Sequence, residues 1–296
     1  MGQNYFDMGN NLDLHTLENY GKSQLFRCFQ KSFRDYPVSF NMTQEQFNRK
    51  FINRLNIRLD LSVGAFVGNQ LTGFIFTSID HFRGLFTAYN GGTGVIPSFR
   101  GKGLTYSMYQ FLIPQLKEIG VTKCLLEVLQ QNEFAQKAYQ RVGFTTTVTL
   151  KCFKRKEEDS IHLKPGEVFQ ISWIPQPDWA LYKTFSNFSP CFLDTPQLLS
   201  HILAKLKIIE AKDQQGRTVG YAIYSPNTGR ISQFGVHKKF RRLGIGSSMF
   251  KFITNLSPAP TYTVMNIPSG ETAIIKFLKK LGFQNEIDQY EMIMKL

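Results

Sequence analysis

Two stretches of the chain follow a short apolar segment with a basic, glycine-rich turn. They read VIPSFRGKGLT at residues 95–105 and VHKKFRRLGIG at residues 236–246. An apolar strand that passes through a tight turn into a helix directs several backbone N–H groups at one point, and the helix dipole adds partial positive charge there. Such a corner binds anions, commonly a diphosphate, and its glycines let the ligand approach closely. The alternative for one such turn is an ordinary helix start with two solvated cations, Arg100 and Lys102.

Three residues in the first half of the chain have side chains suited to proton transfer. Tyr139 lies in a predicted helix, and a phenol with a pKa of about 10 keeps its proton at neutral pH and can act as a general acid. The alternative for Tyr139 is a core aromatic on an amphipathic helix. Glu127, on the predicted strand before it, is a candidate general base whose pKa partial burial would raise, or else a hydrogen-bonded strand carboxylate. Asp80, at the end of a predicted hairpin, is the other candidate base.

Apolar periodicity predicts the elements that position these groups in the first half of the chain. Thr43 and Gln46 form a capping-box pattern at the start of one helix, and Gly143 is suited to end another. In chain order the prediction is helices at 22–34 and 43–56, an antiparallel meander of strands at 61–67, 71–79 and 85–95, a helix at 103–119, a strand at 123–129, a helix up to Gly143 and a strand from 145.

The second half repeats this order of elements after a charged linker at residues 154–167 that contains Pro-Gly. The interval from Arg100 to Gly143 is 43 residues, and that from Arg241 to Gly282 is 41 residues. Matching order and spacing indicate an internal duplication. The predicted elements are a strand at 169–174, helices at 179–185 and 196–206, a hairpin at 208–225, a strand at 231–236, a helix at 244–256, a strand at 261–267, a helix at 271–283 and a strand at 290–296. We therefore expect two domains, residues 1–155 and 156–296.

The two motifs of the first half resemble the signatures of the GNAT superfamily, the Gcn5-related N-acetyltransferases. Its acyl-CoA pattern [RQ]-x-x-G-x-[GA] matches Arg100 to Thr105, with Thr105 in place of the usual Gly or Ala. The family's second signature is similar to a later stretch of this chain, Asn132-x-x-Ala135-x-x-Ala138-Tyr139-x-x-x-Gly143-Phe144. The resemblance implies an α/β fold of two tandem GNAT-like domains, each with a mixed, mostly antiparallel central sheet flanked by helices.

The resemblance also implies a role for each matching residue. Val95 and Ile96 would pair with the pantetheine arm of coenzyme A through their main chains, and Asn132 would hydrogen-bond that arm. Tyr139 would protonate the departing thiolate. The coenzyme A diphosphate would be held by the backbone of Arg100, Gly101, Lys102, Gly103, Leu104 and Thr105.

The implied activity is direct transfer of an acetyl group from acetyl-CoA to a primary amine on a small molecule or peptide. The other interpretation is a non-catalytic acyl-CoA-binding regulatory module. Asn90, in a stretch of small residues in a central strand, could face the substrate, and the Asp35-Tyr36-Pro37 loop could form a lid over the acceptor.

The second copy keeps the turn but not the acid. Arg241, Arg242, Gly244 and Gly246 match the acyl-CoA pattern. Counted back from Gly282, however, Leu278 stands in the place of Tyr139 and Glu271 in that of Asn132. We therefore expect the first domain to be catalytic and the second to be degenerate or supporting, unless Tyr262 or Tyr290 supplies an acid.

Composition narrows the class of protein. The net charge is +13, of which residues 1–155 carry +8 and the rest +5, so the charge is not gathered in a tail or helix as nucleic-acid binding would favour. It suits a small polyanion such as a nucleotide cofactor. Four cysteines without CxxC spacing and five dispersed histidines predict no metal site. We expect a cytoplasmic protein, because no apolar run is long enough for a membrane span and the first residues lack a secretory pattern.

Overall fold

The computed structural model describes residues 12–36, 41–156, 169–186, 188–256 and 259–296. The chain forms two compact units. Unit 1 comprises Met1–Thr147 with Tyr290–Leu296, and unit 2 comprises Val148–Gln289. Most of each expected half, 1–155 and 156–296, falls in one unit. The difference arises at two long strands, each of which has residues in both units.

Those two strands are β6 (Thr145–Lys156) and β12 (Gln284–Lys295). The first residues of β6 and the last residues of β12 belong to unit 1, and the remainder belongs to unit 2. The end of β12 is part of the core of unit 1, where Met292 and Met294 are buried with Met108 and Leu112. The final strand therefore completes the sheet of the first half, which the sequence did not reveal.

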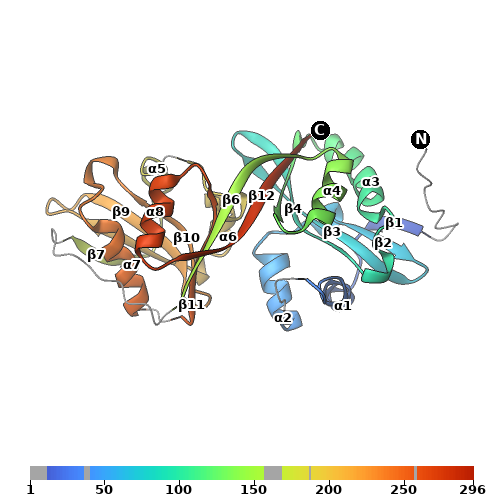
Figure 1. Cartoon of the computed structure of the whole chain (residues 1–296), viewed down its shortest axis with the longest axis horizontal. Helices are drawn as coiled ribbons and strands as arrows, with labels where there is room; N and C mark the ends of the chain where they lie inside the picture. Colours follow the sequence, from blue (N-terminus) through green and yellow to red (C-terminus); the bar gives the residue numbers. More distant parts are fainter. Residues whose placement is uncertain (1–11, 37–40, 157–168, 187, 257–258) are drawn as a thin grey trace. The chain divides into compact units, whose positions relative to one another are not determined.

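Unit 1 has the predicted strand meander and the predicted pair of later helices (Figure 1). Its other elements are β1 (Leu12–Thr16), α1 (Lys22–Ser32), α2 (Gln44–Phe47), β2 (Val63–Val67), β3 (Gln70–Phe82), β4 (Leu85–Val95), α3 (Leu104–Glu118), β5 (Lys123–Leu129) and α4 (Glu133–Val142). The strand order is β1-β2-β3-β4-β5-β12. Neighbours from β1 to β4 are antiparallel and β4–β5 is parallel, so the sheet is mixed and mostly antiparallel as predicted.

Local signals fix where several of these helices begin and end. At the start of α2 the Thr43 side chain accepts from the Gln46 N–H at 3.2 Å, and Gln46 Oε1 accepts from the Thr43 N–H at 2.8 Å, which is the predicted capping box. The predicted helix of residues 43–56 is shorter as an α-helix, because it continues from Asn48 to Asn53 as a π-helix. Gly143 ends α4 in the left-handed region, as predicted.

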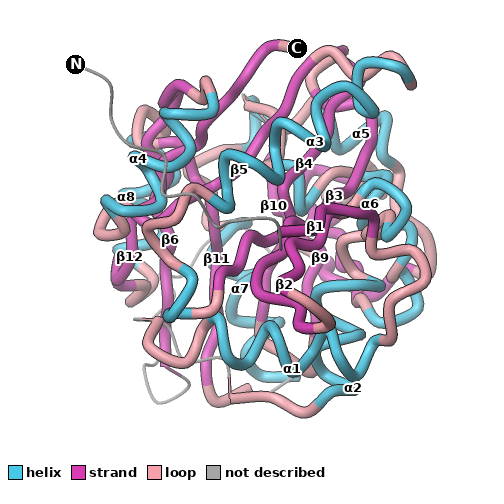
Figure 2. The backbone as a smooth tube through the Cα atoms, turned by 90° about the vertical axis from the view of Figure 1, so that its right-hand side faces the viewer, coloured by secondary structure: helices cyan, strands magenta, loops and turns pink. Residues whose placement is uncertain are grey.

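The sheet of unit 1 is covered on both faces. Alternate residues of β3 point to opposite sides. Phe74 stacks at 6.3 Å on Phe29 of α1, whereas Ile75 lies in a core cluster with Met108 and Leu112 of α3. Accordingly, α1 and α2 lie on the opposite side of these strands from α3 and α4 (Figures 1 and 2).

Unit 2 repeats the arrangement. Its elements are β7 (Gln170–Ile174), α5 (Trp179–Lys183), α6 (Pro196–His201), β8 (Lys207–Lys212), β9 (Thr218–Ser225), β10 (Arg230–Val236), α7 (Ile245–Leu256), β11 (Thr261–Pro268) and α8 (Thr272–Lys280). The strand order is β6-β11-β10-β9-β8-β7, with β10–β11 parallel and the other neighbours antiparallel. The predicted linker lies mostly outside the described residues. No helix in the described part of the chain is long and apolar enough to cross a membrane.

Candidate active site

The two parallel strands of unit 1 pair only over a short distance. The register of β4 and β5 runs from Thr87 opposite Lys123 to Tyr89 opposite Leu125. Beyond that point β4 carries a bulge, because Asn90 pairs with Thr77 of β3 and Gly92 with Phe76, which leaves Gly91 as the extra residue. In the described structure, the main chain of β4 is therefore not paired with β5 beyond Tyr89.

The basic turn after β4 has the backbone that an anion site needs. Gly101 and Gly103 have φ of 75° and 79°, in the left-handed region that glycine adopts at little cost, and α3 begins at Leu104. In this fully described stretch no hydrogen bond is recorded from the backbone N–H groups of residues 101–105. These groups lie at the N-terminus of a 15-residue helix, where the dipole favours negative charge. Lys102 is exposed and adds a cation.

Arg100 is occupied within the protein. Its guanidinium donates to Asp35 at 2.6 and 2.7 Å, to the Ser32 carbonyl at 2.7 Å and to the Val95 carbonyl at 3.1 Å. The pKa of Asp35 is lowered, first by its hydrogen bond to Arg100. Arg100 thus ties the end of α1 and the Asp35–Tyr36 segment to the end of β4. Its side chain holds the turn in place, and only its backbone is left for a ligand.

The main chain at residues 95 and 96 is also partly used. Ile96 donates its N–H to the Thr72 carbonyl at 2.9 Å and accepts from the Phe99 N–H at 2.8 Å. Because hydrogen-bonded and non-hydrogen-bonded pairs alternate in an antiparallel ladder, Val95 and Thr93 direct their main-chain groups away from β3. The Val95 carbonyl accepts from Arg100, so the Val95 N–H and the Thr93 main chain are the groups that face the separation of β4 and β5.

Tyr139 of α4 is buried, with 8% of its surface exposed. Burial raises the pKa of its phenol to about 12, although a hydrogen bond with Thr93 opposes this rise and one with Asn90 does so to a smaller extent. Tyr139 also packs edge-on against Phe144 at 5.9 Å, which is the core contact that the alternative interpretation of this residue expects. The phenol thus combines a core position with polar contacts to the strand that carries the turn.

Asn132 and Tyr36 lie close to this phenol. The Asn132 side chain accepts from the Ala135 N–H at 3.1 Å and so caps α4. Burial raises the pKa of Tyr36, and a hydrogen bond with Asn132 partly opposes the rise. Tyr36 also interacts electrostatically with Tyr139. The loop that was predicted as a lid therefore brings a second phenol to the site, although its Pro37 lies outside the described residues.

Glu127 is half-buried on β5 and accepts a hydrogen bond from the Tyr89 hydroxyl of β4. Tyr89 lines a small cavity with Asn90 and Tyr109. Glu127 is thus both a hydrogen-bonded strand carboxylate and a neighbour of the strand end where β4 and β5 separate. Asp80, in contrast, accepts from the N–H of His81, a local bond within the end of β3.

The turn of unit 2 repeats the two carbonyl contacts that the arginine makes in unit 1. Arg241 donates to the Val236 carbonyl at 3.0 Å and to the Phe185 carbonyl at 2.8 Å, as Arg100 does to Val95 and Ser32. A bulge occurs at Ser232 of β10, where Gly91 lies in β4. Two differences stand out. The recorded hydrogen bonds of Arg241, in the part of the chain described, include no carboxylate, and Arg242 adopts the left-handed φ of 71° where unit 1 has Gly101.

Unit 2 is apolar at the position that corresponds to Tyr139. Leu278 of α8 is fully buried where unit 1 has Tyr139. Phe277, its neighbour, packs so closely on the turn that a Cβ atom added at Gly246 would lie 3.0 Å from its ring. Glu271 precedes α8 without capping it. The alternative acids lie elsewhere: the Tyr262 hydroxyl bonds to the backbone of residues 254 and 259, and residue 290 belongs to unit 1.

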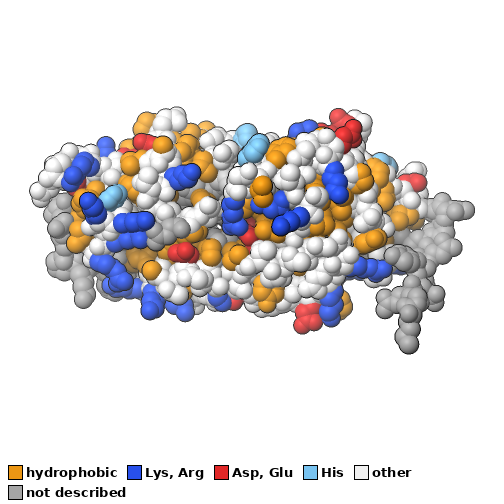
Figure 3. All heavy atoms as spheres, turned by 90° about the horizontal axis from the view of Figure 1, so that it is seen from above, with side chains coloured by type: hydrophobic (Ala, Val, Ile, Leu, Met, Phe, Trp, Pro, Cys, Tyr) orange, Lys and Arg blue, Asp and Glu red, His pale blue; other side chains and the backbone are white. Residues whose placement is uncertain are grey.

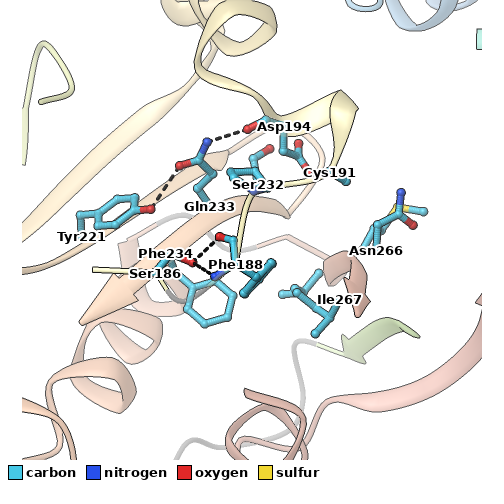
Figure 4. Close-up of a pocket in the computed structure, with 13 residues that line it drawn as sticks. Ser186, Phe188, Cys191, Asp194, Tyr221, Ser232, Gln233, Phe234, Asn266 and Ile267 are labelled. Carbon is cyan, nitrogen blue, oxygen red and sulfur yellow. Dashed lines mark hydrogen bonds between the residues drawn. The ribbon is translucent and has the colours of Figure 1, made fainter. Parts of the chain in front are cut away.

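A small pocket in unit 2 lies where β10 and β11 separate (Figure 4). Several of its polar groups hydrogen-bond to one another. Tyr221 donates to Gln233 at 3.1 Å, and Gln233 donates to the Asp194 carbonyl at 2.6 Å. The Asp194 carboxylate forms an ion pair with Arg230 at 2.6 Å. Phe188 and Phe234 form an apolar wall.

Positive charge is distributed over the surface. Figure 3 shows Lys and Arg side chains across the visible face, interspersed with hydrophobic and uncharged groups. This agrees with the similar excess of positive charge that both halves of the sequence carry.

Two regions of the chain, residues 24–144 and 167–283, match the family described as the acetyltransferase (GNAT) family. A Bacillus subtilis (strain 168) protein, the uncharacterized N-acetyltransferase YdgE, is 24% identical over 139 residues, which are 45% of this chain and 82% of that protein.

Solved structures share the fold over nearly the whole chain. A tandem GNAT protein from the clavulanic acid biosynthesis pathway has a TM-score of 0.73 at 12% identity and covers 96% of this chain and 98% of its own. A GCN5-related N-acetyltransferase from Sphaerobacter thermophilus has a TM-score of 0.69 at 12% identity, with 97% and 96% covered. With both halves matched and the tandem fold shared, this chain belongs to the acetyltransferase (GNAT) family.

Proposed function

We propose that this protein is an N-acetyltransferase that moves an acetyl group from acetyl-CoA to a primary amine of a small molecule or peptide, with its active site in unit 1. The observation that carries the proposal is the proximity, within one unit, of an anion-binding turn and a buried phenol. Tyr139 contacts Thr93 of β4, the strand that ends shortly before the turn.

The residues present fit acetyl-CoA. The backbone N–H groups of residues 101–105 form a cradle for a diphosphate at the start of α3, and Lys102 adds charge. The Val95 N–H and the Thr93 main chain face the separation of the parallel strands and are suited to pair with the pantetheine arm. Asn132 at the start of α4 and Tyr36 in the segment after α1 line the same region.

When bound, acetyl-CoA supplies an activated acetyl group that the amine attacks directly. The chain has to accept a proton from the amine and provide one for the leaving sulfur. Tyr139 remains protonated at neutral pH, because burial raises its pKa to about 12, so it holds a proton for the sulfur. Glu127, through Tyr89, is the group that we assign to receive the proton of the amine.

Unit 2 has a supporting role in this proposal. Its turn has the backbone of an anion site, but an apolar side chain, that of Leu278, occupies the position that corresponds to Tyr139. Leucine carries no exchangeable proton, so a ligand held there would not react by the same route. We assign the catalytic site to unit 1 for this reason.

The test is the Tyr139→Phe variant. We expect its turnover with a panel of primary amines to fall by about 100-fold or more, in the range of general acid catalysis, while the Kd for acetyl-CoA measured by calorimetry stays within about threefold. Leu278→Phe in unit 2 is the matched control and should leave turnover unchanged. Unaltered turnover in Tyr139→Phe would remove the acid, and acetyl-CoA binding without turnover on any amine would instead indicate a binding module.

A further inference from the structure

We infer that Asn90 and Thr93 are positioning residues that orient the hydroxyl proton of Tyr139 toward the separation of β4 and β5, through a directed chain of hydrogen bonds. The inference rests on the proposed function, because it concerns the acid of the same site. It adds two residues that lie outside the family's two sequence motifs.

The chain of bonds begins at a backbone group that can only donate. The Gly92 N–H donates to Asn90 Oδ1 at 2.9 Å. This contact fixes the orientation of the Asn90 amide, since the oxygen must face the N–H. The Asn90 Nδ2 then donates to the Thr93 hydroxyl at 2.7 Å and to the Tyr109 hydroxyl at 2.7 Å. The bulge at Gly91 allows Asn90 and Thr93, three residues apart, to meet on one side of β4.

The next step fixes the direction of the Thr93 hydroxyl. Because its oxygen accepts from Asn90, its own proton is available to a further acceptor. Thr93 is also hydrogen-bonded to Tyr139, so we assign its proton to the phenol oxygen, which accepts it. The Asn90 amide, which also hydrogen-bonds Tyr139, has only N–H groups on that side, so the proton of Tyr139 is directed away from both Asn90 and Thr93.

Unit 2 shows that the fold does not need this network. Its β10 and α7 follow β4 and α3 at a constant spacing of 141 residues, which the matching bulges and arginine contacts support. At the corresponding positions, Ile231 replaces Asn90, Phe234 replaces Thr93 and Phe250 replaces Tyr109. With Leu278 at the position of Tyr139, all four members are apolar, and Ile231, Phe250 and Leu278 are buried in their own core.

This comparison separates function from packing. Buried polar groups cost free energy unless all of them are satisfied, so an apolar set is the simpler way to fill these positions. Unit 2 uses the apolar set and has no acid. Unit 1 has the polar residues Asn90, Thr93 and Tyr109 together with the acid, which is the pattern expected of groups that position the phenol of Tyr139.

The test compares Thr93→Val with Thr93→Ser. Valine removes the hydroxyl at nearly the same volume, whereas serine keeps it. We expect kcat to fall about tenfold in Thr93→Val and to stay within about twofold in Thr93→Ser, with the Kd for acetyl-CoA unchanged in both. Thr87→Val is the control, because Thr87 is a buried threonine of the same strand whose hydroxyl donates to the Leu85 carbonyl, away from Tyr139.

A second measurement does not depend on activity. In protein labelled with ¹³C at tyrosine Cζ, the Tyr139 resonance is the one that Tyr139→Phe removes. It should shift in Thr93→Val and in Asn90→Leu, and keep its position in Thr87→Val.

The outcomes distinguish two failures. If Tyr139→Phe is slow but Thr93→Val matches Thr93→Ser in kcat and in the Tyr139 resonance, the positioning role is wrong and the proposed function stands. If Tyr139→Phe turns over normally, the acid itself is wrong and the positioning role falls with it.

Discussion

At the scale of single residues, Arg100 shows how the side chain of a motif residue can hold the backbone of the turn in place. The family pattern suggests a cation beside a diphosphate, yet the guanidinium binds one carboxylate and two backbone carbonyls of its own unit. Arg241 makes the two carbonyl contacts in the same way. We conclude that the first arginine of the turn fixes the corner so that the following backbone N–H groups converge.

Arg100→Lys tests this conclusion. Lysine keeps the charge but cannot form the planar, multiple contacts of arginine. We expect the Kd for acetyl-CoA, measured by calorimetry, to rise about tenfold in Arg100→Lys and to a similar extent in Arg100→Ala. Lys102→Ala, which removes an exposed charge and its contact with the Phe99 ring, should raise the Kd less than about threefold. Binding by Arg100→Lys at the level of the unaltered protein would show that charge, and not geometry, is what Arg100 supplies.

The Asp35–Arg100 pair also predicts a response to acid. Arg100 lowers the pKa of Asp35, so the pair is fully formed above the ordinary value of 3.8 and is lost as the pH falls through the lowered value. Both side chains are about half exposed, so the pair adds little to global stability. The protection factors of the amides of residues 33–36, which compare each exchange rate with the intrinsic rate at the same pH, should fall below pH 4 when followed by NMR, and Asp35→Asn should show the lower protection already at pH 7. Asp60→Asn, which breaks the exposed Arg58–Asp60 pair, is the control and should leave these amides unaffected.

At the scale of elements, the two turns use different residues for one backbone conformation. Gly101 and Arg242 occupy the same left-handed position, which costs a residue with a side chain about 1 kcal/mol. Arg242→Gly should therefore raise the free energy of unfolding of unit 2 by about 0.5–1 kcal/mol, and Gly101→Ala should lower that of unit 1 by about 1 kcal/mol. Calorimetric unfolding would detect both shifts. A lower stability of Arg242→Gly would mean that the arginine side chain contributes contacts worth more than the strain.

At the scale of the whole molecule, the end of β12 belongs to the core of unit 1. Met292 is fully buried there and Met294 is 7% exposed. Met292→Ala should destabilise unit 1 by about 2–5 kcal/mol, the usual cost of such a cavity.

Removing residues 290–296 should abolish acetyl-CoA binding in calorimetry, and a peptide of those residues added in excess should restore part of it. A truncated chain that binds as well as the full one would contradict the assignment of this strand.

The buried thiols and phenols predict a loss of stability in alkali. Burial raises the pKa of Cys28 and Cys124 from 9.0 to about 12, and that of Tyr139 from 10.0 to about 12. Below pH 9 both folded and unfolded chains keep these protons. Between pH 9 and 12 the unfolded chain loses them first, so stability falls, by at most about 1.4 kcal/mol per pH unit for each group. The Tm measured between pH 8 and 10.5 should decline, and the decline should be shallower in Cys124→Ala.

Sequence patterns located most elements because apolar spacing and glycine positions depend on the local chain. The capping box at Thr43, the end of α4 at Gly143 and the start of α3 after Gly103 all lie where these patterns predicted. The same patterns did not reveal the π-helical turn after α2 or the length of β12, since both depend on what the residues pack against.

The sequence by itself determined the duplication, the two basic, glycine-rich turns and the loss of the phenol from the second copy, because residue types and their spacing along the chain carry each of them. Only the tertiary structure decided that Asp35, 65 residues before Arg100, occupies its guanidinium, that Thr93 contacts Tyr139, and that residues 290–296 fold with the first half. Backbone conformation follows local residue types, whereas the partner of a polar side chain depends on which elements pack together.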